Sequence, residues 1–374
     1  MKNRRTFLLS FTALIIATSA SGAIAQPYND AIGVLYTASN ATDVNQVLAF
    51  QQMRDGSLKA IGTTATGGKG SGSGLGNQGG LALTRDRRLL LAVNAGSNEI
   101  SVFRFNGDQP VLVNKVSSGG TRPVSIAVQN QTVYVLNAGS DDIVGFRLYS
   151  SGQLVQLPDS RRPLSGQGTA PAQVSFTPDG SFVVVTEKST NQIATFPVIY
   201  YGNVGYLGNR ISNPSVANTP FGFAFDRKGR LLVSEAVGGA PNGSSISSYN
   251  LFNNGRLKTI TPAAKTNQTA ACWVVVSKDG EYAYTSNTAS GTLSGFKILP
   301  NGALKALNAD GVTASTGTGS GPIDMIFSRN GRFLSSLNTG NGTITTFRLR
   351  EGGRLVSSGS ISNLPRSANG LVAR

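Results

Sequence analysis

Two glutamates, Glu187 and Glu235, stand at matching places in neighbouring segments of the chain, each at the end of an apolar run. Two carboxylates facing one pocket repel each other, so one could hold a raised pKa and serve as an acid or a base. With nearby amide and carbonyl oxygens, the pair could also bind a cation such as Ca²⁺. Alternatively, each glutamate caps its own loop or pairs with Lys188.

The 374-residue chain contains no histidine and a single cysteine, Cys272. A Ser-His-Asp triad, a Cys-His dyad, imidazole acid/base chemistry and His-ligated zinc or haem are therefore excluded. Any acid/base step would fall to carboxylates, lysine, tyrosine or ordered water. Apart from the possible Ca²⁺, we expect no metal or other cofactor.

A four-strand repeat recurs along the chain and would position these residues. Its first strand is apolar and often opens with proline; examples without proline are residues 78–83 and 271–276. A polar turn, a second strand ending in Asn or Glu, an aromatic third strand and a fourth strand follow. The aromatic third-strand residues are Phe50, Phe103, Phe146, Phe196, Tyr249, Phe296 and Phe347. Seven such units predict an all-β fold, a seven-bladed β-propeller with four antiparallel strands per blade.

The ends of the chain predict how the ring closes. The first repeat, residues 33–61, holds only the second, third and fourth strands, and residues 367–373 match a first strand with nothing after it. We therefore expect the C-terminal strand to complete the first blade and leave no open edge. Between the first two repeats, residues 67–74 are rich in glycine but lack the spacing and the helix of a phosphate-binding loop, so we interpret them as a flexible link.

In a four-stranded blade, first strands begin and second strands end on the same face of the ring, here called the pocket face. Besides the two glutamates, the second strands end at Asn40, Asn94, Asn137, Asn287 and Asn338. These amides could bind a polar ligand, or each could satisfy the backbone of its own loop. Trp273 could stack on a sugar or pack between blades, Asp324 could join the pocket or cap the backbone, and Arg122 and Arg366 could orient an anion or remain solvated.

The first 25 residues have the pattern of a signal peptide. Lys2, Arg4 and Arg5 precede a short apolar run over residues 7–17, and Ala-Ile-Ala at residues 23–25 forms a cleavage site. The paired arginines also fit a twin-arginine signal, so both that route and the Sec route stay open. We expect residues 26–374 to form the mature propeller, periplasmic or secreted and not spanning the membrane.

The repeats resemble the seven-bladed lactonase-type propellers, which include 6-phosphogluconolactonase and carboxymuconate cycloisomerase and are related to the Tyr-Val-Thr-Asn (YVTN) repeat proteins. The resemblance extends over the mature chain and rests on segments such as Val-Tyr-Val-Leu-Asn at residues 133–137 and Phe-Thr-Pro-Asp-Gly at residues 176–180. It implies a His, Arg and Glu cluster on the pocket face, with a Pro-Arg-His motif ahead of a first strand. The matching stretch here is Pro220-Phe221-Gly222, and Ala236 occupies the place of the family glutamate.

Positive charge gathers on the face opposite the pocket, here called the turn face. The turns between first and second strands carry Arg85, Arg87, Arg88, Arg227, Lys228, Arg230, Lys278, Arg329 and Arg332. This basic rim could attract an anionic envelope polymer, or it could simply provide solubility. The export signal and the lack of a recognition motif argue against nucleic acid.

Two hypotheses of function follow. The first is an exported, lactonase-like propeller without the family's His and Arg, which binds a small polar or anionic ligand in the pocket or an envelope partner. The second is a sugar-acid lactone hydrolase or cycloisomerase in which Glu187 or Glu235 activates water and Arg122 or Arg366 holds a carboxylate.

Overall fold

The computed structural model describes residues 30–374, and residues 31–374 form one compact unit. The predicted signal peptide lies outside the described residues. Within the described part of the chain, no helix is both long enough and apolar enough to cross a membrane.

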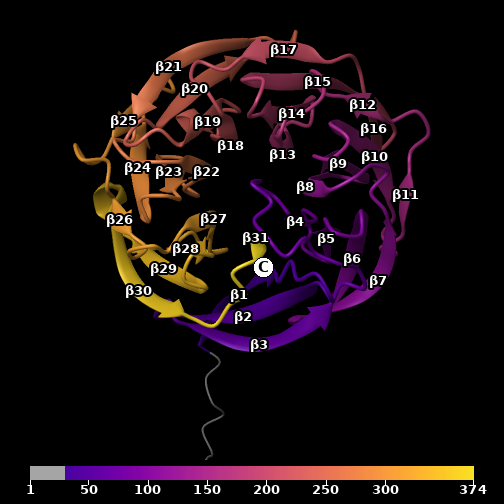
Figure 1. Ribbon diagram of the computed structural model, residues 1–374, viewed down its shortest axis with the longest axis horizontal. Coiled ribbons are helices and arrows are strands. Elements are labelled where there is room, and N and C mark those ends of the chain that lie inside the picture. Colours follow the sequence, from indigo (N-terminus) through magenta and orange to yellow (C-terminus); the bar gives the residue numbers. More distant parts are fainter. Residues whose placement is uncertain (1–29) are drawn as a thin grey trace, which may run out of the picture. The chain divides into compact units, whose positions relative to one another are not determined.

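Seven antiparallel sheets are arranged as blades around a centre (Figure 1). The first three blades are β31 (Asn369–Ala373), β1 (Ala31–Ala38), β2 (Gln46–Met53), β3 (Leu58–Ala65); β4 (Leu81–Leu83), β5 (Leu89–Asn94), β6 (Glu99–Asn106), β7 (Gln109–Ser117); and β8 (Pro123–Gln129), β9 (Thr132–Asn137), β10 (Asp142–Leu148), β11 (Leu154–Gln156), β12 (Arg162–Pro163). The fourth and fifth are β13 (Pro171–Phe176), β14 (Phe182–Glu187), β15 (Gln192–Tyr201), β16 (Val204–Leu207), β17 (Ile211–Pro214); and β18 (Pro220–Phe225), β19 (Leu231–Glu235), β20 (Ser245–Leu251), β21 (Leu257–Lys265). The last two are β22 (Ala271–Val276), β23 (Tyr282–Asn287), β24 (Thr292–Ile298), β25 (Leu304–Ala306), β26 (Ala314–Ser315); and β27 (Pro322–Phe327), β28 (Phe333–Asn338), β29 (Thr343–Leu349), β30 (Leu355–Ile361). Two short 3₁₀ helices, η1 (Val237–Gly239) and η2 (Glu351–Gly353), lie in loops.

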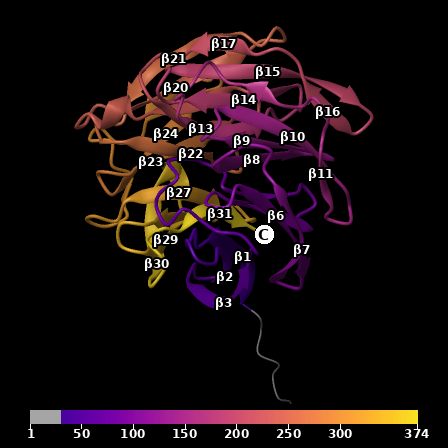
Figure 2. The ribbon, with the colours of Figure 1, turned by 45° about the vertical axis from the view of Figure 1, so that its right-hand side comes forward.

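The C-terminal strand closes the ring, as the sequence predicts. Strand β31 pairs antiparallel with β1, with Tyr36 opposite Val372 and Ala38 opposite Asn369. Backbone bonds in both directions between Val34 and Arg374, of 3.0 and 2.8 Å, extend the pairing. Figures 1 and 2 show this yellow strand beside the indigo first blade. The first and last described strands thereby satisfy each other's backbone groups.

The outer strand is interrupted in the third, fourth and sixth blades, where a short fifth strand pairs with the third strand. In the third blade, the carbonyl oxygen of Gly145 accepts from the backbone N–H of Leu157 at 2.9 Å, whereas the N–H of Gly145 donates to the hydroxyl of Ser160 at 3.1 Å. A side chain thus replaces one ladder bond at the break between β11 and β12.

The core lies between adjacent blades. All seven third-strand aromatic residues predicted from the repeat are buried, at 6% exposure or less. Burying one large aromatic side chain per blade gives each sheet an apolar partner on its neighbour.

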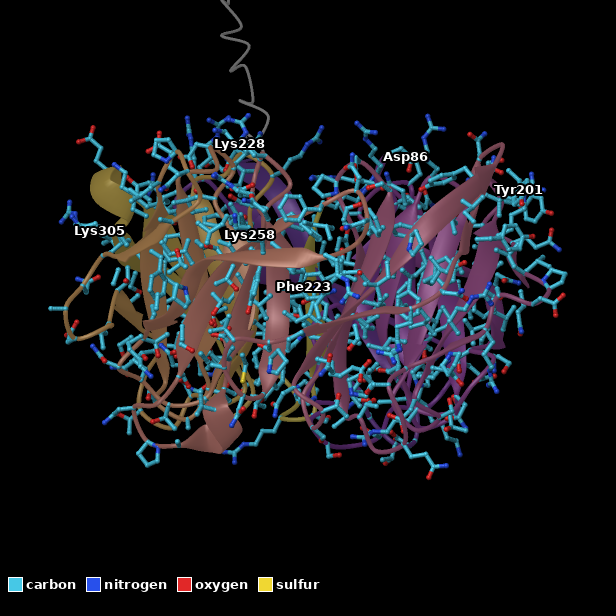
Figure 3. All side chains as sticks on the ribbon, turned by 90° about the horizontal axis from the view of Figure 1, so that it is seen from above. Asp86, Tyr201, Phe223, Lys228, Lys258 and Lys305 are labelled. Atoms are coloured by element: carbon cyan, nitrogen blue, oxygen red, sulfur yellow. The ribbon has the colours of Figure 1, made fainter. Side chains whose placement is uncertain are left out.

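Basic side chains on the turn face join neighbouring blades. Arg227 donates to the carbonyl oxygen of Asp279 at 3.1 Å, and Lys278 donates to that of Arg329 at 3.2 Å. Figure 3 shows Asp86 and Lys228 at this edge of the ring. Part of the predicted basic rim therefore also has a structural role, since each such cation satisfies a turn carbonyl of the next blade.

Candidate functional site

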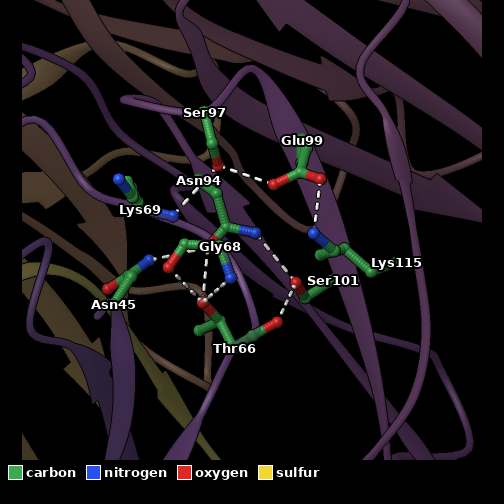
Figure 4. A network of polar contacts seen from close by, with 9 residues as sticks. All are labelled: Asn45, Thr66, Gly68, Lys69, Asn94, Ser97, Glu99, Ser101 and Lys115. Carbon is green, nitrogen blue, oxygen red and sulfur yellow. Dashed lines mark hydrogen bonds and ion pairs between the residues drawn. The ribbon is translucent and has the colours of Figure 1, made fainter. Parts of the chain in front are cut away.

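The five asparagines at or just after the second-strand ends are buried and bonded locally. Figure 4 shows Asn94, which accepts from Thr66 at 2.6 Å and Asn45 at 3.0 Å and donates to Ser101 at 2.8 Å. Its side chain therefore ties the link after the first blade to the second blade. The contacts of Asn94 are those of a loop-capping residue.

The other four asparagines differ in detail. Asn40 donates to the carbonyl oxygen of Ser73 at 2.7 Å, and so holds the glycine-rich link. Asn137 donates to Asp142 at 2.9 Å. Asn287 and Asn338 each donate to two hydroxyls of the following third strand. These contacts all lie within a blade or a neighbouring link.

The two glutamates are fully buried and engaged separately. Glu187 accepts from the hydroxyl and backbone N–H of Ser165 and from Thr190 at 2.8 Å. Glu235 accepts from the Ser245 hydroxyl at 2.7 Å. Burial raises the pKa of Glu235 to about 7, against a smaller opposing effect of nearby serine hydroxyls. Among the described residues, no hydrogen bond joins the two carboxylates.

The remaining predicted residues divide between surface and core. Arg122 and Arg366 are exposed. Trp273 is buried, with its ring centroid 5.1 Å from that of Phe221. Asp324 is buried and accepts the backbone N–H of Met325 at 2.8 Å, and burial raises its pKa to about 8. Within the described part of the chain, no group of three or more His, Cys, Asp or Glu residues could hold a metal ion.

Lys188 is a half-buried cation on the pocket face. Its ammonium group donates to the carbonyl oxygen of Gly76 and lies 4.6 Å from the ring centroid of Phe221. It does not pair with Glu187, which has the partners given above. Burial lowers the pKa of Lys188 to about 8, and the nearby charge of Arg122 acts in the same direction. An ammonium group has three N–H donors, and the bond to Gly76 uses one of them, so the others can bind a ligand.

The link after the first blade enters the centre of the ring. The sequence predicts a strand over residues 78–83, but strand β4 begins only at Leu81. Leu75 and Asn77, which precede this strand, are buried. Asn77 exchanges amide bonds with Asn369, one of 2.8 Å and one of 3.2 Å. We call residues 75–80 the central plug.

Gln78 of the plug reaches the sixth blade. Its side-chain amide accepts from the backbone N–H of Val274 at 3.1 Å and donates to the carbonyl oxygen of Val274 at 3.0 Å. In the fourth blade, Gln173 makes the same pair of bonds with Phe223, at 2.7 and 3.0 Å. The matching residue of the fifth blade is Gly222, so the plug supplies the amide that Gly222 lacks.

The closeness of Gly222 to the plug bears on the resemblance. A Cβ atom added to Gly222 would collide with the Oε1 atom of Gln78 and lie 2.5 Å from the carbonyl oxygen of Cys272. The place at which the family motif has histidine is therefore filled by Gln78, and Phe221, at the place of the arginine, is buried beneath Lys188.

A hollow of about 470 Å³ opens on the pocket face between the fourth and fifth blades. Its lining includes Lys188, Asn191, Asn218 and Thr219, with Val237 of η1 at its edge. One partly buried cation among amides and hydroxyls suits a small anion with hydroxyl groups. Neither Glu187 nor Glu235 lines this hollow.

Sequence reasoning missed Lys188 as a site residue, although the repeat contains a signal for it. The residues directly after the second-strand ends are Ala41, Ala95, Ala138, Lys188, Ala236, Thr288 and Thr339. Lysine is the only charged residue in this set, at a position that faces the crowded centre of the ring.

Comparison with known proteins places the chain among similar sequences and folds. An uncharacterized protein of Lactococcus lactis is 25% identical over 56% of this chain, and the match spans only 64% of that protein's length. A 6-phosphogluconolactonase of Serratia proteamaculans is 24% identical over 72% of this chain and 80% of its own length. The structure of the periplasmic gluconolactonase PpgL of Pseudomonas aeruginosa superposes with a TM-score of 0.73 and 16% identity, covering 91% of this chain and 98% of that one.

The family model described as "Lactonase, 7-bladed beta-propeller" matches residues 33–163 and 234–369, which together make up more than half of the chain. The match includes the first blades and the closing segment, in agreement with the repeats and the ring described above. The chain therefore belongs to the lactonase family of seven-bladed β-propellers.

Proposed function

We propose that this protein is an exported lactonase-family propeller that binds a small anionic ligand of the sugar-acid class beside Lys188 and does not hydrolyse lactones. The observation that carries the proposal is the filled centre of the ring. Gln78 occupies the space next to Gly222, and Phe221 is buried under the Lys188 ammonium group. Export is supported by the signal-like pattern of residues 1–25 and by the periplasmic relative from Pseudomonas aeruginosa.

The hollow supports the ligand class. Its cation would meet a carboxylate or phosphate group, and Asn191, Asn218 and Thr219 would meet hydroxyl groups. Because the pKa of Lys188 is about 8, the ammonium form that attracts an anion is lost as the pH rises through that value. Anion binding should weaken over the same range.

Titration calorimetry with 6-phosphogluconate and gluconate tests this proposal. Lys188→Met should weaken binding about tenfold or more, the value of one charge-assisted hydrogen bond. Lys258→Met is the matched control, because Lys258 is an exposed lysine on the outer strand β21. Equal affinities in the two variants, or no binding of either sugar acid to the parent protein, would reject the proposal.

A lactone hydrolase or cycloisomerase is the second candidate. The Serratia proteamaculans relative named 6-phosphogluconolactonase favours it, as does Glu235, since a carboxyl group with a pKa of about 7 suits proton transfer near neutral pH. Turnover on a panel of sugar-acid and aromatic lactones, lost in Glu235→Gln or Glu187→Gln, would establish this function and overturn the binding-only proposal.

A further inference from the structure

A second, basic hollow lies on the turn face between the second and third blades. Its volume is about 280 Å³, and its lining includes Arg85, Arg88, Arg104 and Tyr149. Arg104 is held in place by a 2.8 Å bond to the carbonyl oxygen of Ser150, and the other two arginines are exposed.

One carboxylate lies among these arginines. Asp86 accepts from Thr84 at 2.6 Å and lies 3.8 Å from the guanidinium of Arg88. The hollow therefore keeps a net positive charge with two guanidinium groups directed to solvent. Guanidinium groups bind carboxylates and phosphates through paired N–H donors.

An aromatic hairpin projects beside this hollow. Strand β15 is ten residues long and forms with β16 a hairpin whose tip carries Tyr201, which is 69% exposed and stacks edge-on against Tyr206 at 5.7 Å. The hairpin lies against the third blade, because Tyr134 donates to the carbonyl oxygen of Gly205 at 3.1 Å and Thr132 donates to that of Asn203 at 3.4 Å. Figure 3 shows Tyr201 near the same edge of the ring as Asp86.

The hairpin and the hollow share a boundary. Asn130 and Gln131, which line the hollow, directly precede Thr132, on which the hairpin tip rests. Tyr149 of the hollow is also partly exposed, and the guanidinium of Arg147 lies 4.7 Å from its ring centroid. The hollow and the hairpin tip therefore lie on either side of the turn at residues 130–132. The arginines and Tyr149 of the hollow, together with Tyr201 of the hairpin, are here called the Arg-Tyr surface.

We propose that the Arg-Tyr surface binds an acidic polysaccharide. The arginines take the acidic groups of the chain, and Tyr201 and Tyr149 offer flat apolar faces with a polar edge to the sugar rings. Acidic residues are interspersed in the hollows of the turn face, such as Asp86, Asp179 and Asp279. This spacing suits a polymer with sparse charge better than a nucleic acid, which carries about one charge per 1.7 Å.

The test is binding of an alginate oligosaccharide, measured by calorimetry at low and at high salt. The double variant Arg85→Met/Arg88→Met should weaken binding about tenfold or more, and Tyr201→Ala should weaken it several-fold, at about the value of one aromatic contact. All three side chains are exposed, so these variants should keep the parent melting temperature. Affinity should fall as salt rises.

A matched control makes the result decisive. Lys305→Met removes one positive charge from β25 in the sixth blade and should leave binding nearly unchanged. Equal loss in Lys305→Met, unchanged binding in Tyr201→Ala, equal affinity for neutral maltoheptaose or for a DNA duplex, or no binding of alginate would each overturn the proposal.

Discussion

The Gln78 side chain links the central plug to the sixth blade, so removing it should lower the free energy of unfolding of the propeller. In Gln78→Ala, the backbone N–H and carbonyl of buried Val274 lose their partners. An unsatisfied buried group costs about 1–3 kcal/mol. Because Gln78 itself is only half-buried and water can enter, we expect a loss of about 2 kcal/mol in the free energy of unfolding.

Gln173 provides the matched comparison. It makes the same two bonds to Phe223 but is only 8% exposed, so Gln173→Ala should cost about 3–4 kcal/mol. Gln78→Met, which keeps the length of the side chain without its polar atoms, should lose as much as Gln78→Ala. Urea unfolding followed by tyrosine and tryptophan fluorescence measures all three variants. A Gln78→Ala protein as stable as the parent, beside a destabilised Gln173→Ala protein, would refute the reasoning about the plug.

Two further predictions concern buried charges. Burial raises the pKa of Glu235 from 4.5 to about 7. As the pH rises, the unfolded chain therefore releases the Glu235 proton at a lower pH than the folded protein does. The stability that the protonated Glu235 side chain contributes is lost between about pH 4.5 and 7. Glu235→Gln should flatten that part of the pH–stability curve by about 3 kcal/mol, and parallel curves for variant and parent would contradict this. Arg230→Met leaves the carboxylate of Asp226 without its 2.6 Å ion-pair partner and should cost about 3 kcal/mol by urea unfolding. The double variant Asp226→Asn/Arg230→Met should lose less free energy of unfolding than the two single variants lose in sum. A loss equal to that sum would show that the two side chains are not coupled.

The fold could be predicted because its determinants repeat. Each blade places an aromatic residue on its third strand and a polar residue at or just after the end of its second strand, and every blade but the first has a polar turn after its first strand. Seven copies of that pattern reinforce one another. The match of residues 367–373 to a first strand also predicted the closure, since an unpaired edge would otherwise remain.

The central plug could not be predicted because its contacts do not repeat. Gln78 bonds to Val274, a residue 196 positions away in a blade that is not its neighbour in sequence. Its apolar surroundings resemble those of a first strand, which is why residues 78–83 were predicted as one. Gln78 fits there because Gly222 has no side chain. The sequence contains 46 glycines, and nothing in it distinguishes Gly222 as the one that leaves this space.

For the candidate site, the sequence indicates positions along the strands but not the directions of the side chains. The strand-end positions lie on the pocket face, but whether Glu187 turns to the centre or to Ser165 depends on loop packing that strand patterns do not encode. Lys188 follows directly after and points to Phe221 instead. Adjacent residues of an extended segment project in opposite directions. The sequence analysis expected Glu187 to face the pocket, and for that reason it did not consider Lys188 as a pocket residue.

One calorimetric experiment tests the central claim most directly, because it detects both binding and turnover. 6-Phosphogluconolactone and 6-phosphogluconate are each injected into the purified protein. We expect saturable binding heat with the acid, reduced about tenfold in affinity by Lys188→Met, and no heat from the lactone beyond its spontaneous hydrolysis. Sustained heat from lactone hydrolysis that disappears in Glu235→Gln would contradict the claim that this propeller binds a sugar acid beside Lys188 and does not hydrolyse lactones.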